Sequence, residues 1–181
     1  MKTVYSQVVK IDDYKPIFNV GDNWYVCFDY TEIMQDANPV LNGGKFVKND
    51  SLVSTGLCSY SYIVYNNYKP PVDVIKNDLE EIINASVSRS IMNDFYWKDS
   101  NINLSKENQM NYKASYDLAA QTNGKNLPIR IKANKNGKTE YLVFFTMKEL
   151  EEFYLAMNLH INNSLERGWQ KKDSIDYSLY I

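Results

Sequence analysis

The sequence predicts an α+β fold, in which a small β-rich N-terminal region is followed by a helix-helix-β-hairpin-helix C-terminal domain. Three observations predict it. Apolar residues alternate with polar ones before residue 68, they recur at helical spacing after residue 70, and an Asn-Gly step separates two apolar runs near residue 136. We therefore expect three parts: a β-rich anchoring region (1–68), a connecting helix (69–94) and an α+β domain (95–181).

The N-terminal region is expected to form three to five short strands. Alternation at period two is visible in residues 4–9, 24–30 and 59–65. Residues typical of turns fall between these runs, at Lys15-Pro16, Val20-Gly21-Asp22, Asn38-Pro39 and Asn42-Gly43-Gly44.

A helix is expected to connect the two parts. Pro70-Pro71 blocks continuation of a strand and presets the first turn of a helix. Apolar side chains then recur at helical spacing up to about residue 94, at Val74, Ile75, Leu79, Ile82, Ile83 and Ile91.

The C-terminal domain begins with a second helix and a hairpin. Ser105 suits an N-cap, and Asn123-Gly124 is typical of a helix end, so a helix is expected to reach about Thr122. Strands 127–132 and 139–145 then flank an Asn-Gly turn. Because a two-stranded hairpin is only marginally stable alone, it must pack on the helices or be completed by strands from elsewhere.

The last long helix is predicted to start at the capping box formed by Thr146 and Glu149 and to stop at Gly168. The aromatic-rich end, residues 175–181, is typical of a short extended arm. Four residues beyond the predicted stop are candidate interface residues: Trp169, Tyr177, Leu179 and Tyr180. The alternative is that they fold back onto the domain.

The residue types needed for metal binding and nucleophilic catalysis are scarce. The chain has one histidine, His160, and two cysteines, Cys27 and Cys58, which are too few for a conventional zinc site. We expect a histidine on the flank of a helix with a local hydrogen bond, and two buried structural thiols. The expectation is no metal, no cofactor and no disulfide in the cytosol.

Acid-base catalysis and nucleic-acid binding are also disfavoured. The glutamates at 149, 151 and 152 crowd the first turn of a helix, where acidic residues favour the helix dipole rather than a cleft. The net charge of −2 gives no general attraction for phosphates, and no apolar run is long enough to cross a membrane. The 15 tyrosines instead suit protein interfaces. We expect a protein that is not an enzyme.

From about Phe95 onward, spaced residue types carry a resemblance. They are Phe95-Tyr96-Trp97, Leu104-Ser105, Glu107-Asn108-Gln109, Asn111-Tyr112-Lys113-Ala114, Tyr116-Asp117-Leu118-Ala119, Leu127-Pro128-Ile129, Phe144-Phe145-Thr146-Met147, Phe153-Tyr154, His160 and the run from Gly168 to Ile175. This segment resembles a small domain of uncharacterised function at the C-terminal ends of phage tail, fibre and baseplate-associated proteins, including those of crAss-like phages.

The resemblance implies a structural or adaptor subunit of a bacteriophage virion, in a head fibre, tail or baseplate. Other virion proteins and further copies of the chain would be its partners, in a particle assembled in the host cytoplasm. Three alternatives stay open: a tail-fibre assembly factor absent from the mature particle, a carbohydrate-active phage enzyme and a regulator of host proteins. The enzyme would need two carboxylates about 5 to 10 Å apart in one cleft.

Overall fold

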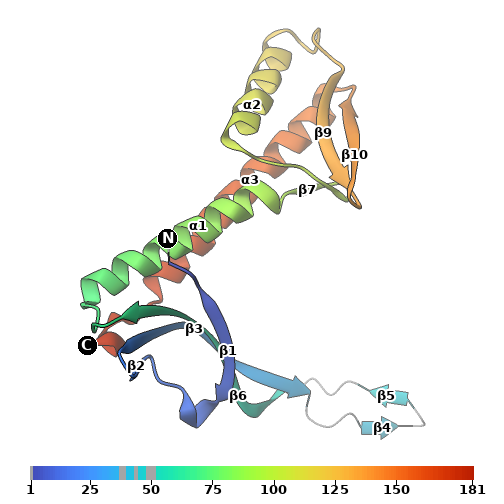
Figure 1. Cartoon of the computed structure of the whole chain (residues 1–181). Coiled ribbons are helices and arrows are strands. Elements are labelled where there is room, and N and C mark those ends of the chain that lie inside the picture. Colours follow the sequence, from blue (N-terminus) through green and yellow to red (C-terminus); the bar gives the residue numbers. More distant parts are fainter. Residues whose placement is uncertain (1, 37–39, 43–44, 48–51) are drawn as a thin grey trace. The chain divides into compact units, whose positions relative to one another are not determined.

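The computed structural model describes residues 2–36, 40–42, 45–47 and 52–181. The fold is α+β, as predicted. The chain separates into two compact units, Met1–Leu79 together with Asp176–Ile181, and Glu80–Ile175 (Figure 1). This division differs from the three expected parts, because the boundary lies inside a helix and the last six residues belong with the first unit.

The first unit contains a four-stranded antiparallel sheet with the order β1-β6-β3-β2. Its strands are β1 (Tyr5–Lys10), β2 (Ile17–Val20), β3 (Asn23–Asp36) and β6 (Leu52–Asn66), with a short 3-10 helix, η1 (Ile11–Asp13), after β1. Two short strands, β4 (Val40–Asn42) and β5 (Lys45–Val47), pair with each other.

The prediction of three to five short strands was wrong. The described residues of the first unit form six strands, and β3 and β6 are 14 and 15 residues long. Asp29 and Gly56 adopt positive φ, and the register shifts between Phe28 and Thr31, so that the strands continue through irregularities instead of ending. The predicted turn at Gly21 is present, whereas Asn38-Pro39 and Gly43-Gly44 lie outside the described residues.

One face of the first sheet packs on the start of α1 (Val72–Asn93). Ile63 and Tyr65 of β6 are buried together with Ile75 and Leu79 of the helix. The Tyr65 hydroxyl donates a hydrogen bond of 2.6 Å to Asp78 Oδ2, which anchors the sheet to this part of the helix.

The C-terminal residues fold back onto the first unit, so the expected extended arm was wrong. Residues Tyr177–Tyr180 form a 3-10 helix, η2, which Asp176 caps by accepting hydrogen bonds from the Ser178 backbone and hydroxyl. Tyr180 is buried and its hydroxyl donates a hydrogen bond of 2.8 Å to the Cys27 carbonyl. This contact spans most of the sequence, and a local pattern cannot reveal it.

The second unit combines the rest of α1 with α2 (Lys106–Gln121), α3 (Met147–Asp173) and a sheet of order β10-β9-β8-β7. The strands are β7 (Tyr96–Trp97), β8 (Ser100–Asn101), β9 (Ile129–Lys135) and β10 (Lys138–Phe144). The predicted hairpin is β9-β10. The short β7-β8 hairpin completes it, because Asn101 pairs with Asn134.

The core of the second unit surrounds Phe153 of α3, whose ring lies 5.1 Å from Phe144 and 5.8 Å from Phe95. Buried residues of α2, β9, β10 and α3 contribute to it, together with three residues next to β7 and β8: Phe95, Ile102, Leu104, Ala119, Ile131, Ala133, Phe144, Leu150, Phe153 and Met157. The hairpin is thus stabilised by packing on the helices, as its marginal stability alone requires.

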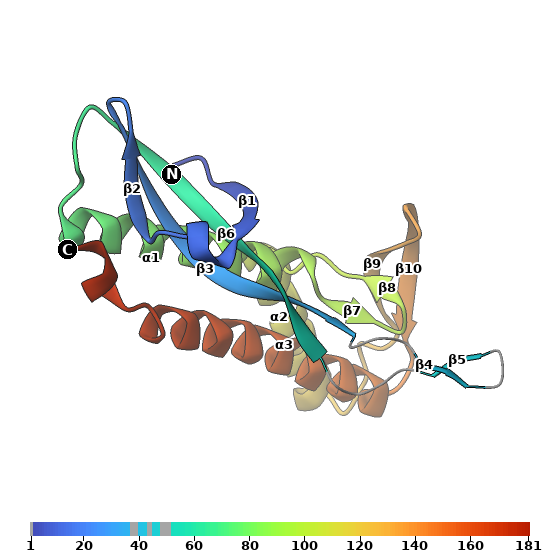
Figure 2. The same cartoon turned by 90° about the horizontal axis from the view of Figure 1, so that it is seen from below.

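Helix α3 continues past Gly168, so the predicted stop was wrong. It ends at Asp173, and Gly168 is buried inside it. A Cβ at Gly168 would lie 2.5 Å from Cγ2 of Val87, so the glycine permits close approach of α1 and α3 rather than ending a helix. Figure 2 shows the two helices side by side, joined also by a 2.7 Å hydrogen bond from Lys172 to Asn84.

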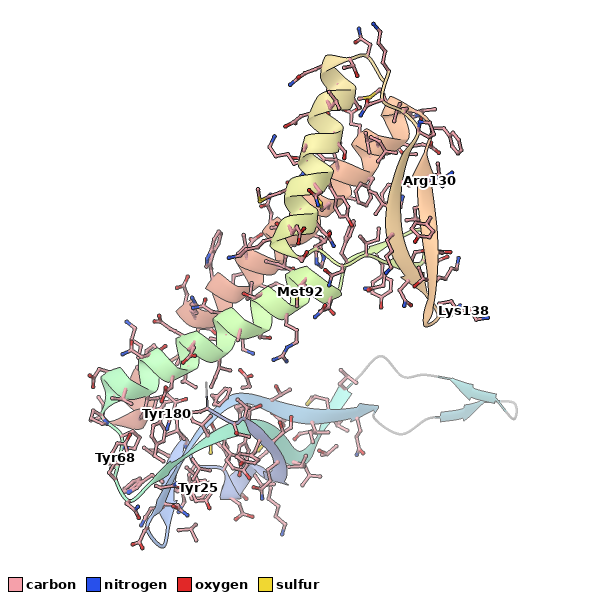
Figure 3. The ribbon with its side chains drawn as sticks, turned by 45° about the horizontal axis from the view of Figure 1, so that its top comes forward. Tyr25, Tyr68, Met92, Arg130, Lys138 and Tyr180 are labelled. Carbon is pink, nitrogen blue, oxygen red and sulfur yellow. The ribbon has the colours of Figure 1, made fainter. Side chains whose placement is uncertain are left out.

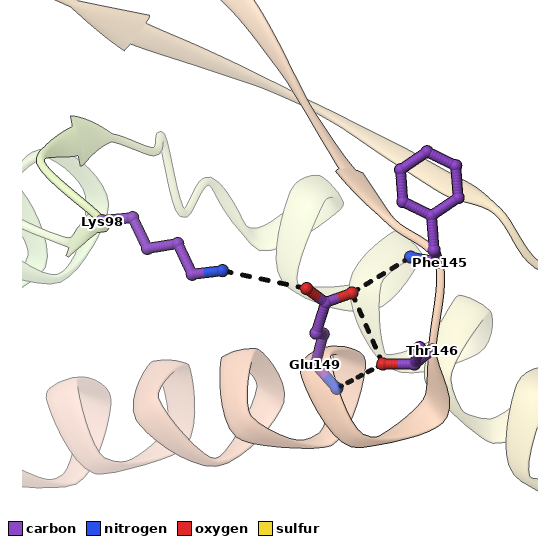
Figure 4. Close-up of polar contacts among 4 residues, drawn as sticks. All are labelled: Lys98, Phe145, Thr146 and Glu149. Atoms are coloured by element: carbon purple, nitrogen blue, oxygen red, sulfur yellow. Dashed lines mark hydrogen bonds and ion pairs between the residues drawn. The ribbon is translucent and has the colours of Figure 1, made fainter.

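The start of α3 agrees with its prediction. The Thr146 hydroxyl accepts a hydrogen bond from the Glu149 backbone, as in a capping box (Figure 4). The Glu149 carboxylate accepts a hydrogen bond from the backbone N–H of Phe145, whereas a capping box predicts the N–H of Thr146. The same carboxylate lies 4.0 Å from Lys98 Nζ. This glutamate is therefore a structural cap.

Candidate functional site

Aromatic side chains gather on the second face of the first sheet, opposite the face that packs on α1. Tyr60 and Tyr62 of β6 alternate with the α1-facing residues, and the registers of β1 and β3 place Tyr5 and Tyr25 beside them. We call this surface the tyrosine face. It consists of Tyr5, Phe18, Tyr25, Tyr60 and Tyr62, with Tyr14 and Tyr30 at its border.

The rings of the tyrosine face form a continuous chain across the sheet. Tyr5 stacks on Tyr62 at 5.3 Å, Tyr62 lies 5.7 Å from Tyr25, and Tyr25 stacks on Phe18 at 4.9 Å. These contacts run from edge strand β1 to edge strand β2, with Tyr25 labelled in Figure 3. Each such pair contributes about 0.5–1.5 kcal/mol beyond its buried area. The face is therefore ordered before any partner binds.

A border of phenol groups extends the face toward η1. Tyr14 lies 5.4 Å from Tyr60 and 4.8 Å from Tyr30. Tyr5 and Tyr30 keep 47% and 43% of their surface exposed, whereas Tyr60 is buried and donates a hydrogen bond of 3.3 Å to Gln7 Oε1. The surface thus presents two half-exposed rings, Tyr5 and Tyr30, beside rings that are more deeply buried.

Burial keeps two groups at this face, Cys27 and Tyr14, neutral at physiological pH. Burial raises the pKa of the Cys27 thiol to about 12. Burial, with further contributions from Cys27 and Cys58, raises the pKa of Tyr14 to about 12. Cys27 and Cys58 are both buried, as predicted, and neither is in a disulfide in this structure. Because the thiolate is the reactive form of cysteine, Cys27 is set up as a packing residue and not as a nucleophile.

A two-stranded ribbon continues from the same sheet. We call residues 33–36 and 52–56 the β-ribbon. The last pair between β1 and β6 is Lys10 with Leu57, so in the described part of the chain β3 and β6 pair only with each other beyond that point (Figure 1). Both outer edges of the ribbon therefore carry backbone groups that can pair with an added strand.

The β-ribbon exposes apolar side chains to solvent. Met34, Leu52 and Val53 have exposed fractions of 44%, 59% and 41%. The ribbon is held by its own hydrogen bonds, such as the one from the Thr55 hydroxyl to the Ile33 carbonyl at 2.7 Å. An isolated ribbon of this kind gains little from burial, which favours a contact with another protein surface.

Sequence reasoning did not identify these residues as a site. The alternation of residues 59–65 predicted the strand, but tyrosines on one face and apolar residues on the other both look like core positions. The β-ribbon was not predicted, because the turn residues at 38–44 suggested that the strands on either side of them were short.

The four predicted interface residues are divided between the two units. Trp169 lies within α3 of the second unit and is 58% exposed, whereas Tyr177, Leu179 and Tyr180 belong to the first unit. Tyr180 is buried within its own chain, although against the first unit and not against the C-terminal domain that the fold-back alternative named, and Leu179 is 51% exposed. An interface role for Trp169 and Leu179 stays a prediction.

His160 lies on the flank of α3, but the predicted local hydrogen bond was wrong. Its Nε2 lies 3.2 Å from the Ser90 carbonyl of α1, and its ring packs 5.4 Å from Phe95. The histidine thus links two helices. Among the residues that the structure describes, no three His, Cys, Asp or Glu side chains gather as metal ligands would.

The helices of the described residues include none that is long and apolar enough to span a membrane. Comparison of the chain with protein-family models, with curated proteins and with solved structures finds no match.

Proposed function

We propose that the chain is a structural or adaptor subunit of a bacteriophage virion that works through protein–protein contacts of the first unit. The observation that carries this proposal is the tyrosine face, a surface of stacked and partly exposed rings on the sheet whose strands β3 and β6 continue into the β-ribbon. Tyrosine and methionine are enriched at protein interfaces, and a sheet edge can accept a strand from a partner.

The virion setting is supported by the resemblance of the segment from Phe95 onward to domains of phage tail, fibre and baseplate-associated proteins. An adaptor needs two separately folded parts, one for each contact. The division of the chain into two compact units meets that need. In this proposal the first unit joins further copies of the chain or another virion protein.

Light scattering coupled to size-exclusion chromatography tests the contact surface. We expect the full chain to form an oligomer at about 50 µM and the Met34→Lys/Val53→Lys variant to be a folded monomer, because two exposed charges oppose burial of the β-ribbon. The matched control, Leu155→Lys/Leu159→Lys on α3, replaces two leucines that are each 61% exposed and should keep the oligomer. A monomeric wild-type chain, or identical behaviour of both variants, contradicts self-association through the ribbon.

Mass spectrometry tests the virion setting separately. Particles purified by density gradient from the phage that encodes the chain should contain its peptides in constant proportion to the major structural proteins. Peptides found in the infected-cell lysate but not in the particles would contradict a structural role and favour an assembly factor.

A further inference from the structure

The second unit has an apolar hollow where the end of α1 meets the start of α2. Its volume is about 570 Å³, within the range of binding sites in proteins. Met92 at the end of α1, Leu104 before α2 and Ile161 of α3 form much of its wall, and Figure 3 labels Met92. Met92 is 39% exposed, so the hollow is open to solvent.

A second hollow, of about 390 Å³, continues along α2 and α3. The two hollows share Lys106, Gln109 and Ile161, so they form one groove. We call it the helix groove. The second hollow adds Met110, Tyr154 and Met157 to the apolar lining, with Lys113 and Asn158 as polar members, and Met110 is 72% exposed. Methionine adapts its shape to different apolar partners, which suits a recognition surface.

The rim of the helix groove is positively charged. Arg89 and Lys106 line it, both are exposed, and neither has an ion pair in the described part of the chain. Lys113, farther along, is paired with Asp117 at 2.5 Å. Two unpaired cations beside an apolar floor complement an apolar surface that carries acidic residues at its border.

We infer that the helix groove binds an amphipathic α-helix of a partner protein, with acidic side chains flanking its apolar stripe. The walls are themselves helices, whose backbone groups are already paired, so a partner strand would find no edge to extend. A helix needs only an apolar trough for residues spaced three and four apart, with charges placed beside it. The inference rests on the proposed adaptor function, because it supplies the second of the two contacts.

A displayed peptide library tests the inference with the full chain as bait. The probe is a set of 16-residue peptides with leucine fixed at helical spacing and all other positions random. Selection is run against the wild-type chain, with removal of peptides that bind the Arg89→Glu/Lys106→Glu variant. We expect the selected peptides to be enriched in Asp and Glu beside the leucine stripe.

Fluorescence anisotropy then measures one selected peptide against matched variants. Its Kd should weaken at least tenfold for Arg89→Glu/Lys106→Glu and stay within twofold for Lys132→Glu/Lys138→Glu, which makes the same change in charge on the exposed sheet of the same unit. Met92→Lys should also weaken binding by tenfold or more, because it places a charge in the apolar wall. Circular dichroism confirms that each variant is folded.

Three outcomes would overturn the inference: no enrichment, selected peptides without acidic residues, or equal weakening by both charge reversals. Binding of dodecanoate in the groove with no peptide enriched would overturn it in favour of a small amphiphile. Failure of the groove is distinct from failure of the proposed function. If the selected peptides are not enriched in acidic residues, the result of the particle mass spectrometry still stands. If the chain is absent from the particles, the measured affinity for the peptide still stands.

Discussion

The two four-stranded sheets of this protein differ in how they use their faces. In the second sheet, β9 alternates strictly, with Ile131 and Ala133 in the core and Arg130 and Lys132 exposed. In the first sheet, β6 carries large apolar or aromatic side chains on both faces. The second sheet therefore follows the usual pattern of an antiparallel sheet with one solvated face, and the first does not.

This difference between the two sheets distinguishes a face that is satisfied by solvent from a face that suits contact with another protein. The charged side chains of β9 on the exposed face of the second sheet are solvated by water. The tyrosine face, by contrast, leaves aromatic surface partly exposed. Exposed apolar surface does not stabilise a monomer, so this face is a candidate contact surface. Proteins also limit the pairing of exposed sheet edges with other strands, for example by placing lysines there. The second sheet carries three such lysines, Lys132, Lys135 and Lys138. The described residues of the β-ribbon include no lysine.

The largest expected effect is in the core of the second unit. Phe153→Ala should lower its free energy of unfolding by about 3–5 kcal/mol, because the ring contacts four other aromatic rings and its removal leaves a cavity. Hydrogen exchange followed by mass spectrometry should show faster exchange in α3 and β9.

The same experiment tests whether the two units are stabilised separately. Exchange in β3 and β6 should change little, and Leu155→Ala, at a residue of the same helix that is 61% exposed, should alter stability by no more than about 0.5 kcal/mol. Equally faster exchange in both sheets would show that the two units unfold as one.

A smaller effect is expected at the close approach of α1 and α3. Gly168→Ala should cost about 1–3 kcal/mol, because the new methyl group would lie 2.5 Å from Cγ2 of Val87, a side chain with little rotamer freedom. In a Val87→Ala background the clash is gone, and the same change should stabilise by up to about 1 kcal/mol through helix propensity. Urea unfolding of the wild type, the two single variants and the double variant gives the coupling free energy between positions 87 and 168. Equal effects in both backgrounds would contradict the packing role.

Gly168 also shows where sequence reasoning about the fold fails. The α+β class, the capped starts of α2 and α3 and the β9-β10 hairpin follow from local signals, which the structure confirms. A glycine at the end of an apolar stripe has two physical uses, a left-handed helix end or a close helix contact. Only the position of Val87, far away in the sequence, decides between them.

The candidate sites were harder to predict than the elements. The β7-β8 turn uses Lys98 and Asp99 at positive φ instead of the usual Asn-Gly step, so no hairpin signal is visible there in the sequence. The tyrosine face depends on which face of β6 is covered by α1, and the helix groove depends on three helices meeting. Both are tertiary arrangements that periodicity within one segment does not specify.

The neutral phenol border of the first sheet predicts a loss of stability in alkali. The pKa of Tyr14 is about 12 in the folded chain against an ordinary value of 10.0, so the folded state holds this proton more tightly. Its contribution is complete below pH 10 and is lost as the pH rises from about 10 through about 12. Urea unfolding should show that Tyr14→Phe gains stability relative to wild type between pH 8 and pH 11. Tyr141→Phe, on the second sheet, is the control, and an equal gain there would exclude a special environment for Tyr14.

The smallest effect compares one substitution on the two sheets. Tyr5→Ala should cost about 0.5–1.5 kcal/mol, because its ring stacks on Tyr62 although nearly half of it is exposed. Tyr141→Ala removes a ring that is 63% exposed and should change stability by no more than about 0.5 kcal/mol. Thermal unfolding at pH 7 measures both. Equal costs would mean that the rings of the first sheet are held no more firmly than an ordinary surface tyrosine, and the tyrosine face would then be a set of separate side chains instead of an ordered surface for a partner.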